Sequence, residues 1–136
     1  MSSRTRFLGR LLGFFSILVA LSMFAHRQAT MEMIATLVNN PAAAFGVGLI
    51  GIAAGLAMIL GHNVWSGGVL PVIVTLVGWG SLIKGLLFLF LPQGVLAGLL
   101  GGPGYERYFD VSPAISLALG LYLVYASGLK DPAPDR

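Results

Sequence analysis

Long apolar stretches alternate with short polar ones along the whole chain. A helix that crosses a bilayer needs roughly 20 mostly apolar residues, and it satisfies its own backbone hydrogen bonds. The pattern therefore predicts an all-α fold, an integral membrane four-helix bundle that forms a single membrane domain over residues 1–136. The spans are expected at about residues 7–25, 41–61, 69–91 and 113–129.

The beginnings of the spans carry local signals. A basic start precedes the first apolar stretch, as in a secretory signal peptide, but Met23 and Ala25 make a poor small-x-small cleavage site. We therefore expect an uncleaved first span. The second and fourth spans begin at Asn40 and Ser112, which can cap a helix, and each is followed by a proline that suits the first turn.

The connecting segments leave alternatives open. Residues 26–40 place Ile34 and Val38 at helical spacing, which predicts either a short helix lying in the membrane interface or an extension of the first span. Residues 92–111 are long for a simple connection, and their apolar first half is too short to cross a bilayer. They predict a segment lying on the surface, with a re-entrant loop over residues 94–104 as the alternative.

Glycine and alanine are concentrated in the second span. Gly51 and Gly55 form a small-x-x-x-small pair, and Gly48 lies about one turn before Gly51. Such residues let two helices approach closely and pack by van der Waals contact. We expect this face to be a helix-packing surface rather than the lining of a pore.

Basic residues gather at one side of the expected bundle. Four spans place both termini on the same side, and that side carries five basic residues: Arg4, Arg6, Arg10, Lys130 and Arg136. The opposite side carries Arg27 and Arg107 together with acidic residues. By the positive-inside rule, both termini are expected in the cytoplasm, and the protein is expected in the cell (inner) membrane as a multi-pass chain.

Composition narrows the function classes. The 136 residues are 57% hydrophobic and 10% charged, whereas about a quarter of the residues of a soluble domain are charged. The formal charge of +3 is carried without a dense Lys/Arg run, so we expect no nucleic-acid partner. Cysteine is absent, which excludes disulfides, thiolate catalysis and cysteine metal sites.

The third span contains a lysine, Lys84. A cation at mid-membrane costs about 3 kcal/mol on insertion scales, and such residues typically face the bundle and are functional. Lys84 lies roughly 10 Å from the outer end of its span, at the depth of Gly48 and Ser116. We expect it to point inward and to pair with Glu106 or Asp110. The alternative is that it snorkels to the outer headgroups on the lipid side.

The other polar residues are expected to have structural rather than catalytic roles. Trp79 is expected to lie in the core and to donate its indole N–H to Thr75, one turn earlier. His62 and Asn63 follow the second span, where they are expected to cap the helix. His26 lies on the opposite side, so two histidines cannot share a metal, and no acid, base and nucleophile meet on one side. We therefore expect no enzyme, no metal and no cofactor.

Two motifs resemble a known family. GHNVW at residues 61–65 and GWGSLIKG at residues 78–85 are similar to segments of small bacterial four-helix integral membrane proteins of uncharacterised function. The resemblance brings no activity with it, and it implies five positions to test: His62, Asn63, Trp65, Trp79 and Lys84. A second similarity, to DoxX-like four-helix membrane proteins, rests on helix count and length.

Two functions compete on this pattern. The glycine face favours a helix-packing or interaction subunit, in a homo-oligomer or a larger membrane complex. Lys84 favours a small transporter or channel subunit that uses this lysine as an intramembrane coupling or selectivity charge. The expected partners are the lipid bilayer and either further copies of the chain or other membrane subunits.

Overall fold

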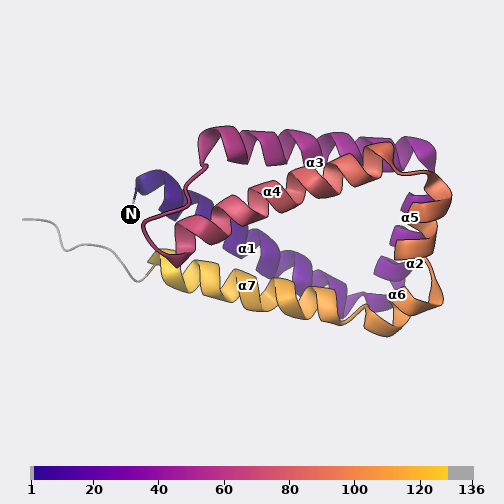
Figure 1. The fold of residues 1–136 in the computed structure, drawn as a ribbon. Helices are drawn as coiled ribbons and strands as arrows, with labels where there is room; N and C mark the ends of the chain where they lie inside the picture. The colour runs from indigo at the N-terminus through magenta and orange to yellow at the C-terminus, as the bar shows by residue number, and fades with distance from the viewer. Residues whose placement is uncertain (1, 129–136) are drawn as a thin grey trace, which may run out of the picture.

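Helices form nearly the whole of the described chain (Figure 1). The structure, a computed structural model, describes residues 2–128, and no strand occurs in that range. The helices are α1 Ser3–Ala25, α2 Arg27–Asn39, α3 Pro41–Gly61, α4 Val69–Phe90, α5 Gln93–Leu100, α6 Pro103–Tyr108 and α7 Val111–Gly128. α1, α3, α4 and α7 are long and apolar enough to span a membrane. The predicted all-α fold with four such helices is confirmed, and it indicates a multi-pass membrane protein.

The predicted spans agree with these helices to within a few residues. α3 has the predicted bounds, and α4 ends one residue early. α1 begins at Ser3 rather than at residue 7, because the Ser2 hydroxyl caps it by accepting the Thr5 N–H at 3.2 Å. Three predicted features lie outside the described residues: the end of the fourth span at residue 129, Lys130 and Arg136.

Three short helices, α2, α5 and α6, close one end of the bundle (Figure 1). α2 is separate from α1 because the backbone at His26 leaves the helical conformation, with φ −125° and ψ 50°. α2 packs against α5, and Val38 and Leu96 are buried in one cluster between them. Residues 26–40 are therefore not an extension of the first span, and residues 92–111 contain two short helices.

Glycine brings the long helices together in two pairs, α3 with α4 and α1 with α7 (Figure 1). In the first pair, a Cβ added to Gly85 would lie 2.6 Å from the backbone nitrogen of Ile52. In the second pair, a Cβ added to Gly120 would lie 2.8 Å from the carbonyl oxygen of Gly13. A carbon atom cannot sit at these distances, so the backbones approach this closely because both positions lack a side chain.

The glycines predicted to pack against another helix lie in the α3–α4 contact of the same chain. A Cβ added to Gly51 would lie 3.0 Å from the Cα of Gly85, and one added to Gly48 would lie 3.1 Å from the Gly85 carbonyl oxygen. A Cβ added to Gly55 would lie 2.5 Å from the backbone nitrogen of Leu82. The face that the sequence offered to a second protein is thus covered by the chain's own α4.

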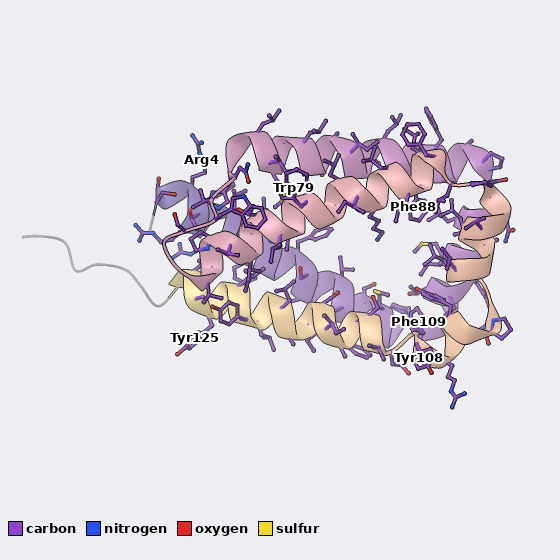
Figure 2. The ribbon with its side chains drawn as sticks, in the orientation of Figure 1. Arg4, Trp79, Phe88, Tyr108, Phe109 and Tyr125 are labelled. Atoms are coloured by element: carbon purple, nitrogen blue, oxygen red, sulfur yellow. The ribbon has the colours of Figure 1, made fainter. Side chains whose placement is uncertain are left out.

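Two buried clusters hold α4 near its two ends. The cluster where α4 crosses α1 and α7 contains Leu70, Val74 and Leu123. The cluster at the other end of α4 includes α2, α3 and α5, and it contains Val38, Ala44, Phe88 and Leu96. Figure 2 shows Phe88 near the end that the short helices close. Between the two clusters, α4 diverges from the α1–α7 pair (Figure 1).

Candidate functional site

Lys84 lines a cavity between α4 and the α1–α7 pair. The cavity has a volume of about 410 Å³, and small-molecule sites typically have roughly 300–1,000 Å³. Its walls come from α1, α2, α4, α6 and α7, so segments far apart in the sequence form it. Six lining residues have polar side chains: Ser22, Thr30, Lys84, Tyr105, Ser112 and Ser116.

The other lining residues are apolar, and all of them belong to α1 and α2. They are Val19, Met23, Met33 and Ile34. No carboxylate is among the lining residues that the described part of the chain contributes. The cavity therefore combines one cation, five hydroxyl-bearing residues and an apolar strip.

The direction of Lys84 follows from the way α4 packs. Its neighbour Gly85 faces α3, and each residue turns an α-helix by about 100°. Lys84 is exposed rather than packed in the α3–α4 contact, and it lines the cavity with residues of α1 and α7. It is the sole charged residue of the sequence between Glu32 and Glu106. Within residues 2–128 it makes no ion pair and no hydrogen bond.

The acidic residues predicted to pair with Lys84 contact Arg27 instead. The Nε of Arg27 donates to Asp110 Oδ1 at 3.0 Å, and its Nη2 donates to the carbonyl oxygen of Glu106 at 3.2 Å. The predicted ion pair between Lys84 and either acid is therefore not formed. Arg27 and Asp110 both lie at the end that the short helices close, whereas Lys84 is six residues, or about 9 Å, from the end of α4.

Arg27 also contacts an aromatic ring, which in turn contacts a second one. Its guanidinium carbon lies 5.5 Å from the ring centroid of Phe109, which is fully buried at the junction of α6 and α7 (Figure 2). Tyr105 meets the same ring edge-on, with the centroids 5.9 Å apart. A tyrosine hydroxyl is protonated at neutral pH and can donate a hydrogen bond, and burial raises the pKa of Tyr105 further. These contacts hold α6, and with it Tyr105, against the start of α2.

Ser116 and Gly48, which were predicted at the depth of Lys84, have different positions. Ser116 lines the same cavity, and Gly48 lies in the α3–α4 contact beside Gly85. The sequence did not single out Thr30 or Tyr105 as site residues. Both belong to short connecting helices, and a hydroxyl in a polar connection carries no signal of its own until the tertiary fold places it over a cavity.

The HNVW residues lie in the α3–α4 turn, outside the Lys84 cavity. His62 is 4% exposed, and its Nε2 has no hydrogen-bond partner among the described residues. Trp65 is exposed, and its Nε1 donates to Asn63 Oδ1 at 2.7 Å. These three residues shape a turn and contribute nothing to the walls around Lys84.

Thr75, on α4, forms hydrogen bonds with the same turn. Its hydroxyl accepts the Val64 N–H at 3.0 Å, and it lies 2.9 and 3.0 Å from the carbonyl oxygens of Val64 and Pro71, to either of which it can donate. The predicted hydrogen bond from the Trp79 indole to Thr75 is wrong, because the turn occupies this hydroxyl. Trp79 is 38% exposed rather than buried in the core.

The role of Thr75 can be tested by removing its hydroxyl. Thr75→Val is expected to lower the free energy of unfolding by about 1–2 kcal/mol, because hydrogen bonds of a buried hydroxyl are lost. Unfolding in a nonionic detergent, followed by circular dichroism, measures the change. The control is Thr36→Val, since the exposed Thr36 hydroxyl donates only to Glu32 within its own helix, and a change within about 0.5 kcal/mol is expected. Equal losses in both variants would contradict the role of Thr75.

Comparison with known proteins assigns this chain to no family. No protein-family model matches the chain, and neither a curated protein nor a solved structure matches it. The family resemblance carried by GHNVW and GWGSLIKG stays a prediction.

Proposed function

We propose that the four long helices cross the cell (inner) membrane with both termini in the cytoplasm. The length and apolar composition of α1, α3, α4 and α7 support insertion. α1 begins and α7 ends at the same end of the bundle (Figure 1), and Arg4, Arg6 and Arg10 lie on the first turns of α1. A basic end of this kind favours the cytoplasmic side. Lys84 then lies in the outer half of the membrane.

The function that the geometry supports best is the binding of an anionic solute at Lys84. In this proposal the protein is a small transporter or channel subunit, and the lysine is its coupling or selectivity charge. One observation carries the proposal: the cavity holds an ammonium group and five hydroxyl-bearing residues, and its described walls hold no carboxylate. A cation in a medium of low dielectric constant attracts an anion strongly, and hydroxyl groups can donate to the oxygens of that anion.

The charge balance of the chain supports the same conclusion. A lysine that served only structure would be expected to have a counterion within the fold, since an isolated cation in lipid costs about 3 kcal/mol. Asp110 could have supplied one, yet its carboxylate accepts from Arg27. A bound anion from outside the chain would supply the negative charge that Lys84 lacks.

Anion binding is expected to stabilise the protein through Lys84. Thermal unfolding in a nonionic detergent would be followed with chloride, phosphate, butyrate and dodecanoate, because a ligand at 100 times its Kd stabilises by about 2.7 kcal/mol. At least one anion should raise the midpoint of the wild-type protein, Lys84→Met should lose the response, and Lys84→Arg should keep it. Arg107→Met is the control, since it removes an equal charge from an exposed site outside the cavity. The proposal is wrong if no anion stabilises the wild type more than Lys84→Met.

The other candidate function, a packing subunit of a homo-oligomer or a larger membrane complex, is supported less well. Gly51 and Gly55 contact α4 of the same chain, so they are not free to hold a second one. The many exposed apolar side chains are equally suited to lipid. Native mass spectrometry from lipid would measure the stoichiometry, and self-association would be compatible with a transport pathway too.

A further inference from the structure

We propose that the anion bound at Lys84 is a single-chain amphiphile with a carboxylate head, such as a fatty-acid anion. This inference rests on the proposed function, because it names the class of anion that the same site takes. It is carried by the division of the cavity wall into a polar part and an apolar strip. Each part recognises one end of such a molecule.

The polar part matches a head with a single negative charge. Lys84 supplies one positive charge, and the described lining residues supply no second cation. A phosphate group carries up to two negative charges at neutral pH, so a carboxylate leaves less charge uncompensated. Ser112 and Ser116 are four residues apart on α7 and share one helix face, from which two hydroxyls can reach the two carboxylate oxygens.

The apolar strip matches one hydrocarbon chain. Val19 and Met23 are four residues apart on α1, and Met33 and Ile34 continue the strip on α2. Methionine is unbranched and polarisable, so it adapts to a flexible chain. A chain that comes from the bilayer is already out of water, so the strip favours it by van der Waals contact rather than by hydrophobic transfer.

The place of the cavity also favours an amphiphile. It lies where α4 diverges from the α1–α7 pair, and Lys84 is about 9 Å from the end of α4. A hydrated ion would have to lose its water to reach this depth. An amphiphile dissolved in the bilayer already has its chain in lipid, and it needs only to bring its carboxylate to the lysine.

Native mass spectrometry of the full chain in phosphatidylcholine nanodiscs tests the inference. The nanodiscs would contain hexadecanoate or hexadecanol at the same mole fraction, and butyrate would be added in the buffer. Hexadecanoate should be retained by the wild type and by Arg107→Met at least tenfold more than by Lys84→Met, because Lys84 is the one cation among the described lining residues that can pair with the carboxylate. Hexadecanol, which has the same chain without the charge, should not be retained.

A second variant tests the chain separately from the head. Met33→Ser alters an exposed position of the strip, so the fold should be kept, and it should weaken hexadecanoate while leaving any butyrate binding unchanged. Equal retention of hexadecanol, or of hexadecanoate by Lys84→Met, would overturn the inference. Butyrate that depends on Lys84 while hexadecanoate is not retained would overturn the inference and leave the proposed function standing. Lys84-dependent binding of neither anion would overturn the inference, and it would overturn the proposed function as well if chloride and phosphate also failed to stabilise the wild type more than Lys84→Met.

Discussion

Gly85→Ala is expected to lower the free energy of unfolding by about 3 kcal/mol, the upper end of typical overpacking penalties. The added Cβ would lie 2.6 Å from the nitrogen of Ile52, 2.8 Å from the oxygen of Gly48 and 2.9 Å from the carbonyl carbon of Gly51. All three atoms belong to the backbone of α3, so no side chain can rotate away. The two helices would have to move apart along their contact.

The matched control for this change is Gly80→Ala on the same helix. A Cβ at Gly80 meets no atom within 4 Å, so stability should stay the same or rise by up to about 1 kcal/mol from the better helix propensity of alanine. Reversible unfolding in a nonionic detergent, followed by circular dichroism, measures both variants. If the two variants were equally stable, the close approach of α3 and α4 would be contradicted.

Lys84→Met is expected to raise the free energy of unfolding of the ligand-free protein by up to about 3 kcal/mol. The substitution removes an unpaired cation from α4, a helix that is otherwise uncharged. The structure gives Lys84 no ion pair within residues 2–128 that the substitution would break. A buried ion pair would give the opposite sign, since removal of one partner typically costs 3–5 kcal/mol. The sign of the change therefore separates the two descriptions.

The measurement for Lys84 requires protein that has been washed free of bound lipid in a nonionic detergent. Lys84→Arg is the control, because it keeps the charge and should leave stability unchanged. A lower unfolding free energy for Lys84→Met would show that the lysine has a counterion in the folded chain. A gain in stability together with a loss of anion response would identify Lys84 as a residue kept for binding rather than for folding.

The sequence predicted the elements well and their partners poorly. The four apolar stretches were sufficient to place α1, α3, α4 and α7, because a spanning helix has a length that the bilayer sets. They did not show that α1 pairs with α7. Small residues occur on several spans, and Gly13, Gly51 and Gly120 offer similar faces until the whole chain is packed.

Of the site, the sequence predicted Lys84 but most of the residues around it were not predicted. Lys84 was recognisable because a cation within an apolar stretch is costly wherever it points. The lack of an ion pair for Lys84 within residues 2–128 was not predictable, since the sequence does not show that α6 packs against α2 and brings Asp110 to Arg27. Thr30, Tyr105 and Met33 were missed because a wall built from five helices has no pattern along the chain.

The pairing of α1 with α7 bears on how the protein is made. α3 and α4 are consecutive, so they can associate as soon as both have left the ribosome. Among the helices of residues 2–128, α1 is synthesised before the others and its partner α7 after them, and a contact between such distant segments forms late. A nascent chain arrested before α7 would expose Gly9 and Gly13 without their partner, in a state open to degradation or to mispairing with another newly made chain.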